Sequence, residues 1–135
     1  MPSIDWDNTF CTGIPLLDVQ NKHFVERVNL LFEHQHEEWN KDFICQIFHD
    51  YLAYTQNHFR QEELFYEQHD PQELYEHREQ HFLFQENLNS LFPDVMDEGP
   101  DASRGLSEFI RDWTVFHILH VDKNIACSIR NSVHF

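Results

Sequence analysis

Residues 74–91 read LYEHREQHFLFQENLNSL, and this stretch decides the fold. Its large apolar side chains and two histidines recur at positions 74, 77, 81, 84, 88 and 91, in steps of three or four residues. Such spacing places all six on one stripe of an α-helix. Asp70 and Pro71 precede the stretch and are typical of a helix N-cap and first turn. We therefore predict a helix over about 71–91 whose inward face carries His77 and His81.

The same period recurs in three further segments, which predicts four helices in all. A helix of about 16–38 has the stripe Leu17, Asn21, Phe24, Val28 and Leu31. A helix of about 41–67 has the stripe Ile44, Phe48, Tyr51, Thr55, His58, Glu62 and Phe65. A helix of about 102–130 has the stripe Leu106, Ile110, Trp113, His117 and Val121. Residues 1 to about 15 lack the period and predict an extended N-terminal arm. Pro93 and Gly99 with Pro100 predict a loop before the last helix. We expect an all-α, up-down-up-down four-helix bundle.

The composition indicates one domain spanning residues 1–135, built from long regular elements. The formal net charge is -15 at pH 7, which disfavours nucleic acid and anionic membrane surfaces as partners. We expect no membrane insertion, because no apolar run approaches the length of a span, and a cytoplasmic location, because no leader pattern opens the chain. Cys11, Cys45 and Cys127 lack the spacing of a disulfide framework or a structural zinc site.

Six side chains that can bind metals fall within three of the helical patterns. They are His58, Glu62, His77, His81, His117 and Asp122, with the spacings H-x3-E, H-x3-H and H-x4-D. One spacing alone is weak evidence, since 11 histidines in 135 residues give about one His pair four apart by chance. Buried imidazoles and carboxylates on three helices, however, are costly unless a metal or dense hydrogen bonding compensates them. The pattern predicts a buried two-metal site, and its imidazole content favours iron or zinc over calcium or magnesium.

At these residues the chain resembles the bacterial hemerythrins over nearly its whole length. The resemblance is carried by LDVQ at 17–20 with Asn29, HFRQEE at 58–63, the two histidines of the third helix, and WTVFHI at 113–118 followed by DK at 122–123. It implies a non-heme site of two iron ions (Fe2+/Fe3+) with a bridging oxo or hydroxo group. It further implies that the imidazoles of His77, His81 and His117 bind one iron, that His58 binds the other, and that Glu62 and Asp122 bridge the two.

One departure from the family pattern bears on function. Where the family has a further histidine after Asp-x-Gln, this chain has Asn21. His23 lies two residues later, about 200° around a helix, and is expected to point away from the site. Asn21 is therefore predicted to leave a weak or vacant ligand position at the second iron. Such a position would admit small ligands, loosen the metal and favour rapid oxidation by oxygen.

These features favour a sensing or binding module over a catalyst. We expect an oxygen-reactive redox or oxygen sensor whose ligand is dioxygen or nitric oxide. The resemblance adds a signalling context, since such domains also occur attached to chemoreceptors and diguanylate cyclases. A stripe of Ile125, Ile129 and Val133 is consistent with a covalently attached output domain. The alternatives are a di-iron oxidase, peroxidase or nitric-oxide-removing enzyme, an oxygen carrier, and a metal-free bundle with a polar core.

Overall fold

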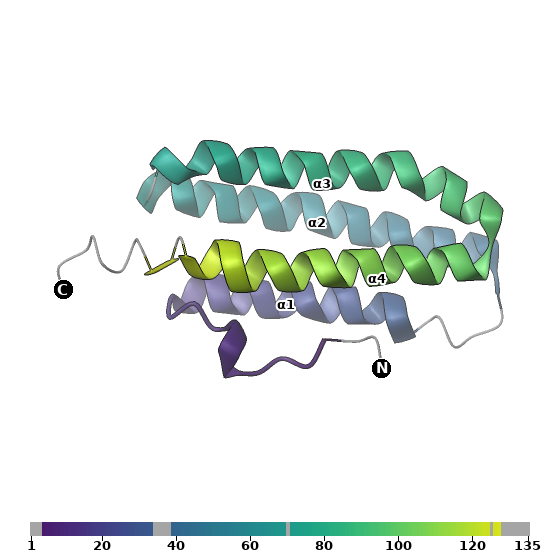
Figure 1. Ribbon diagram of the computed structural model, residues 1–135, viewed down its shortest axis with the longest axis horizontal. Coiled ribbons are helices and arrows are strands. Elements are labelled where there is room, and N and C mark those ends of the chain that lie inside the picture. Colours follow the sequence, from purple (N-terminus) through teal and green to yellow (C-terminus); the bar gives the residue numbers. More distant parts are fainter. Residues whose placement is uncertain (1–3, 34–38, 70, 125, 128–135) are drawn as a thin grey trace.

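The computed structural model describes residues 4–33, 39–69, 71–124 and 126–127, and these residues form a four-helix bundle (Figure 1). The helices are α1 (Pro15–Glu33), α2 (Lys41–His69), α3 (Pro71–Glu98) and α4 (Pro100–Phe116), and a π-helical turn, η3 (His117–Asp122), continues α4 without a break. Helix α1 contacts α2 and α4, and α3 also contacts α2 and α4. Each connection is short enough to join neighbouring antiparallel helices. The predicted all-α bundle is confirmed.

The N-terminal arm is held against α1 by two polar side chains of that helix. Asn29 accepts a hydrogen bond from the Ile4 amide at 2.7 Å and donates one to the Ile4 carbonyl at 2.9 Å. Asp18 accepts from the Thr12 amide at 2.6 Å and from its hydroxyl at 2.7 Å. The side chain of Phe10, in the short 3-10 turn η1 (Asn8–Phe10), is buried in the main core. The arm therefore packs on the bundle through its apolar side chains, as predicted.

The predicted stripes supply most of the core, with shifts of one position in α2, in α3 and in the last helix, where Trp113 and Val121 are half-buried beside buried Thr114 and Asp122. Phe65 is half-buried while Tyr66 is fully buried, and Leu91 is 44% exposed while Phe92 is buried. The reason is that the buried positions near these helix ends continue in steps of four, from Glu62 to Tyr66 and from Leu88 to Phe92. A step of four advances slightly more than one turn of 3.6 residues, so the buried stripe drifts around the helix.

The prediction that α3 ends in a loop at Pro93 is wrong. Helix α3 runs through Pro93 to Glu98, and Gly99 alone separates it from α4. Pro93 is exposed, so water can replace the backbone hydrogen bond that a proline cannot donate. Phe92 and Met96 on the opposite side are buried, and burying both side chains favours continuation of the helix. Figure 1 shows the last turns of α3 bending toward α4.

Gly99 makes the turn between α3 and α4 with a φ of 104°, a conformation that L residues with a side chain rarely adopt. Pro100 then begins α4, where its lack of an amide hydrogen costs nothing. The predicted ends of the first helix near residue 38 and of the last near residue 130 lie outside the described residues. So does the stripe of Ile125, Ile129 and Val133.

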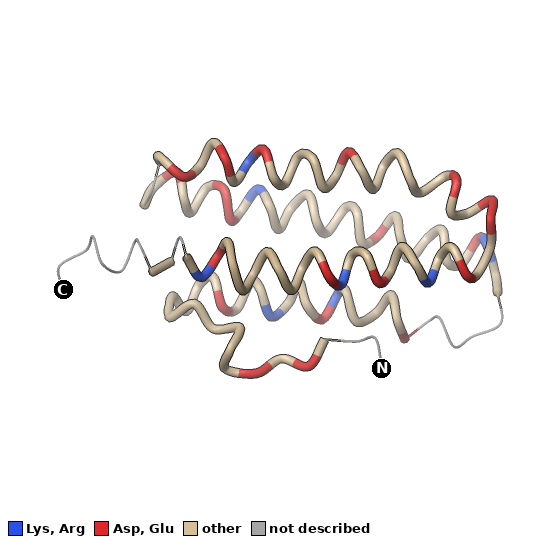
Figure 2. The backbone as a smooth tube through the Cα atoms, viewed as in Figure 1, with Lys and Arg blue, Asp and Glu red and all other residues tan. Residues whose placement is uncertain are grey.

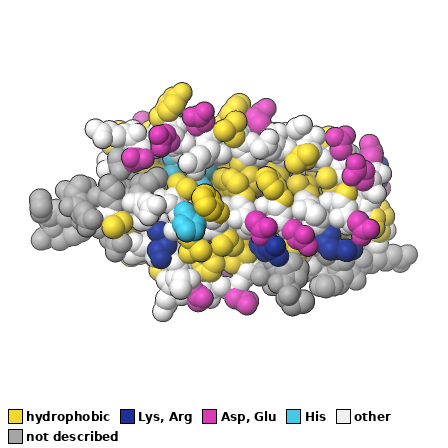
Figure 3. Space-filling model, viewed as in Figure 1, with side chains coloured by type: hydrophobic (Ala, Val, Ile, Leu, Met, Phe, Trp, Pro, Cys, Tyr) yellow, Lys and Arg dark blue, Asp and Glu magenta, His cyan; other side chains and the backbone are white. Residues whose placement is uncertain are grey.

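Acidic residues outnumber basic ones, 24 against 9, and occur along all four helices (Figure 2). On the face formed by α3 and α4, apolar side chains make a band between the acidic groups (Figure 3). Phe82, Phe109 and Phe116 are among the exposed large apolar residues of these two helices. In the described part of the chain, no helix is long and apolar enough to cross a membrane.

Candidate metal centre

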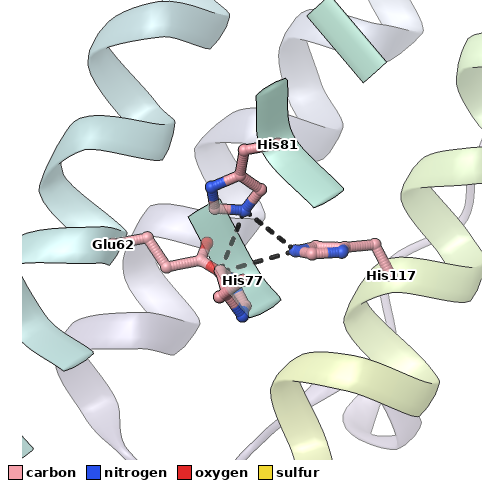
Figure 4. Close-up of side chains that lie close together, drawn as sticks. All are labelled: Glu62, His77, His81 and His117. Atoms are coloured by element: carbon pink, nitrogen blue, oxygen red, sulfur yellow. Dashed lines mark hydrogen bonds and ion pairs between the residues drawn. The ribbon is translucent and has the colours of Figure 1, made fainter. Parts of the chain in front are cut away.

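Side chains from three helical segments converge at a buried point near one end of the bundle. Glu62 comes from α2, His77 and His81 from α3, and His117 from the start of η3 (Figure 4). One donor atom from each lies within 4.8 Å of the other three. None of the four residues is more than 3% exposed. The structure therefore brings together four of the six residues predicted to bind metal.

The imidazoles of His77, His81 and His117 all direct their Nε2 atoms toward the centre of this group. Nε2 of His81 lies 3.2 Å from Nε2 of His117, and Oδ1 of Asp122 lies 3.4 Å from Nε2 of His77 and 3.3 Å from Nε2 of His117. Oε1 of Glu62 contacts His77 and lies 3.7 Å and 3.5 Å from the inner nitrogens of His81 and His117. A metal about 2.1 Å from each donor holds neighbouring donors roughly 3 Å apart, which these spacings approach.

The second oxygen of each of these two carboxylates lies on the side of His58 and Asn21. Oε2 of Glu62 lies 3.3 Å from Nε2 of His58, and Oδ2 of Asp122 accepts a hydrogen bond of 3.3 Å from the Asn21 side chain. Glu62 thus presents one oxygen to the three imidazoles and one to His58, while Asp122 presents one oxygen to His77 and His117 and one to Asn21. The donor atoms divide into two groups that share both carboxylates, which is the arrangement that two bridged metals require.

The π-helical turn explains how Asp122 reaches the group from a position five residues after His117. In a regular α-helix, residues five apart differ by about 140° around the axis. In η3 the turn is wider, and the amide of Lys123 bonds to the carbonyl of Ile118, five residues back. Such turns occur mostly as single insertions in α-helices, often at functional sites. The extra residue in the turn brings Asp122 back beside His117, and the H-x4-D spacing is its signal in the sequence.

Burial and mutual contacts shift the pKa values of the clustered groups in different directions. Burial, followed by the charge of Glu62, raises the pKa of Asp122 well above its ordinary value. Burial would also raise the pKa of Glu62, but the charge of His77 and hydrogen bonds from three histidines hold it well below its usual range. Burial lowers the pKa of His117 to about 4, so this imidazole is neutral near pH 7. Hydrogen bonds from Glu62 and Glu63 raise the pKa of His81 against the effect of burial. Metal binding uses neutral imidazoles and ionised carboxylates, so a bound cation would replace the protons that these groups retain.

Two buried oxygens in the second group lack a full set of hydrogen bonds among the described residues. Oδ1 of Asn21 has no partner, and Oε2 of Glu62 has only the 3.3 Å contact with Nε2 of His58. An unpaired buried oxygen is costly, and a cation placed between His58 and these oxygens would satisfy both. The residues present therefore fit a metal on this side as well as on the side of the three imidazoles. His23 is 61% exposed and pairs with Glu26, so it points away from the site as predicted.

An aromatic ring covers each of the four imidazoles. Phe59 stacks on His81 with ring centroids 3.8 Å apart, Phe24 on His58 at 4.4 Å and Trp113 on His117 at 4.5 Å, while Tyr66 lies tilted against His77 at 4.6 Å. These contacts fix the ring orientations and keep water from the donor atoms. These aromatic side chains therefore also form the wall of the site.

Two further residues support the donors and were not predicted to take part. Glu63 accepts from Nδ1 of His81 at 2.9 Å and pairs with Arg78 at 3.3 Å. The hydroxyl of Tyr66 lies 3.5 Å from Oδ1 of Asp122. Partners of this kind orient an imidazole or a carboxylate that binds a metal. Glu63 directly follows Glu62, and the sequence pattern places Glu62 on the inward stripe but does not reveal that Glu63 holds His81.

Comparison with known proteins agrees with this architecture. No protein-family model matches the chain. A bacteriohemerythrin of Pseudomonas paraeruginosa is 27% identical over 133 residues, which cover 98% of this chain and 86% of that protein. Bacteriohemerythrins of Pseudomonas aeruginosa strains are 26% identical over the same share of each chain. The chain is thus a homologue of the bacteriohemerythrins over nearly its whole length, and this similarity, together with the bundle and its buried His and Glu cluster, supports a bacterial hemerythrin domain.

Proposed function

We propose that the chain is a non-heme iron domain that reacts with oxygen, and that it holds two iron ions with a bridging oxo or hydroxo group. The observation that carries the proposal is the division of the donor atoms by Glu62 and Asp122 into two groups. Iron in such a site supplies the electrons and the open coordination position that the binding or reduction of oxygen needs. The similarity to bacteriohemerythrins favours iron over zinc.

In this proposal His77, His81 and His117 hold the first iron and His58 holds the second, while Glu62 and Asp122 join them. The stacked aromatic rings exclude water from the donor atoms. The outer carboxylate of Glu63 keeps the His81 ring in position. Each role follows from a contact in the structure and from the chemistry of the side chain.

Asn21 makes the donor sets of the two proposed iron positions unequal. An amide oxygen is a weaker donor than an imidazole, and the amide nitrogen of Asn21 already donates to Asp122. We infer that the second side keeps an open position and releases its metal more readily. Such a position would be open to dioxygen, and we therefore expect the iron-loaded, reduced protein to oxidise quickly and not to store oxygen. A domain of this kind reports the presence of oxygen through its oxidation state.

A sensing role follows from the same asymmetry. Loss or oxidation of a metal held on the Asn21 side would change the contacts of Glu62 and Asp122, and these residues belong to α2 and η3. A change at the site is thereby coupled to the relative position of two helices. Nitric oxide would use the same open position. We propose cytoplasmic sensing with a covalently attached output domain as the biological context.

The proposal is tested by admitting oxygen to iron-loaded, anaerobically reduced protein and recording visible absorption over time, for the original chain and for Asn21→His. The original chain should pass quickly to an oxidised spectrum that persists when oxygen is removed. Asn21→His should oxidise at least several-fold more slowly, because it restores an imidazole donor. Lys22→His, which places a histidine on the exposed neighbouring residue, is the control and should behave as the original chain. Equal rates for the original chain and Asn21→His would refute the role given to Asn21.

A further inference from the structure

A pocket opens on the surface beside the buried cluster, between α3 and η3. It has a volume of about 210 Å³, and its lining includes Glu73, Glu76, His77, Gln80 and His120. On this face of the molecule histidine side chains reach the surface and acidic side chains gather along α3 (Figure 3). Glu76 and His120 are exposed and Glu73 is half-buried, so the two carboxylates and the imidazole are accessible to ions in solution.

His77 belongs both to this pocket and to the buried cluster. Its Nε2 lies among the donor atoms, whereas Figure 4 shows its other ring nitrogen pointing away from them. The side chain is fully buried, yet that nitrogen, Nδ1, has no hydrogen-bond partner among the described residues. His81 differs, because Glu63 holds its Nδ1 at 2.9 Å. A buried imidazole nitrogen needs a partner, and the pocket is the place from which one can come.

The charges around this pocket favour a cation. Two carboxylates, those of Glu73 and Glu76, line it, and among the described residues its lining contains no lysine or arginine. Another pocket, of about 250 Å³ between α2 and α3, lies on the other side of α3 and includes Glu63 in its lining. That pocket has two arginines, Arg60 and Arg78, against this single glutamate. Surface charge of one sign around a concave opening raises the local concentration of the opposite ion, so cations should gather beside His77.

We propose that the pocket lined by Glu73, Glu76 and His120 is the port through which a divalent metal ion enters the buried cluster, and that His77 receives the ion from it. The inference rests on the proposed function only in assuming that the cluster holds metal. A metal ion must cross a shell of side chains that are almost completely buried, and His77 spans that shell with one nitrogen on each side. Glu62 and Asp122 contact Nε2 of His77, but no described residue bonds to its Nδ1, as Glu63 bonds to Nδ1 of His81. That outer nitrogen is therefore available to meet an ion that enters through the pocket.

The test is the rate of uptake of Fe2+ by metal-free protein under anaerobic conditions, followed by tryptophan fluorescence. Trp113 stacks on His117, so metal binding to that imidazole should quench its emission. The double variant Glu73→Gln with Glu76→Gln should take up Fe2+ about tenfold more slowly at low salt, and the difference should shrink at high salt. The final iron content should equal that of the original chain, because neither residue belongs to the buried cluster.

The matched control is Glu79→Gln with Glu86→Gln, which removes the same charge from exposed positions of α3 outside both pockets. Its rate should stay near that of the original chain. Equal slowing of both double variants would mean a general charge effect and would overturn the port, as would an unchanged rate in the Glu73 and Glu76 variant. An original chain that takes up no Fe2+ would contradict the proposed function as well, so the two failures can be told apart.

A second pair of variants tests the two pockets against each other. Gln80→Lys places a positive charge in the proposed port, and Gln85→Lys places the same charge in the pocket between α2 and α3. Both residues lie on α3, and neither belongs to the buried cluster. Gln80→Lys should slow Fe2+ uptake while Gln85→Lys leaves it unchanged. The reverse order of rates would assign entry to the other pocket and overturn the proposal.

Discussion

Glu62 and Asp122 carry the chemistry of the site at the scale of single residues. Each is 1% exposed. Glu62 presents one oxygen to the three imidazoles and the other to His58, while Asp122 presents one oxygen to His77 and His117 and the other to Asn21. Two buried carboxylates so close together cannot both be charged at low cost without a cation, which is why burial and Glu62 raise the pKa of Asp122. The metals therefore complete a charge balance that the protein side chains leave open.

The unequal donor sets predict that the two metals can be separated by one substitution. His58→Ala removes the only imidazole of the second group, so the chain should retain the metal bound by His77, His81 and His117 and lose the other. Elemental analysis of anaerobically loaded protein should then show about one iron per chain in the variant, against two in the original chain. His23→Ala removes an exposed imidazole and should leave the iron content unchanged. Two irons retained in His58→Ala would contradict this division.

At the scale of elements, the sequence predicts the helices and the inward positions well because both depend on local periodicity. His58 and Glu62, or His77 and His81, must lie on one face of any helix that contains them. The contribution of Asp122 depends on the π-helical turn η3, which periodicity alone does not reveal. The only sign of this turn in the sequence is that Asp122 follows His117 by five residues, where a regular helix would favour four.

Pro93 is a position at which the local sequence pattern predicts the wrong structure. A proline inside a helical pattern ordinarily marks its end, and this rule predicts the wrong boundary for α3. The helix continues because Phe92 and Met96 are buried against the core while Pro93 faces solvent. Phe92 packs edge to face on Phe48, with ring centroids 5.6 Å apart. Tertiary packing of this kind cannot be inferred from the neighbours of the proline in the sequence.

The N-terminal arm supplies a prediction at the same scale. Asn29→Ala removes both hydrogen bonds to Ile4 and should lower the free energy of unfolding by about 1–3 kcal/mol. The arm should also loosen, shifting the fluorescence of Trp6, which packs against the main core and stacks on Phe10. Urea denaturation gives the stability, and Trp6→Phe identifies the part of the emission that comes from the arm. A variant with unchanged stability and emission would show that Asn29 does not hold the arm.

At the scale of the whole molecule, the bundle encloses a polar centre within an aromatic core. Histidine and carboxylate side chains occupy positions where burial ordinarily selects leucine or phenylalanine. Such a centre weakens the metal-free bundle, since its groups lose water without gaining full hydrogen bonding. The large negative charge of the surface adds self-repulsion. The stability of the folded chain should therefore depend strongly on bound metal.

Metal removal tests this dependence. Iron-loaded protein should unfold with a free energy about 4 kcal/mol or more above that of protein stripped with a chelator, when free metal exceeds its dissociation constant about a thousandfold. Urea denaturation of both forms under anaerobic conditions measures the difference. Calcium and magnesium should restore none of the lost stability, because they prefer sites made of oxygen donors. Equal stability of the loaded and stripped forms would mean that the buried cluster does not need a metal.

The most direct test of a site with two metal positions is Mössbauer spectroscopy of the protein after anaerobic loading with Fe2+ that is enriched in the Mössbauer-active isotope. The three imidazoles on one side, and His58 with Asn21 on the other, provide different donor sets that share Glu62 and Asp122. The spectrum should therefore contain two distinct iron signals of equal area, with about two irons bound per chain. A single signal with one iron bound per chain would contradict the division of the cluster into two metal sites.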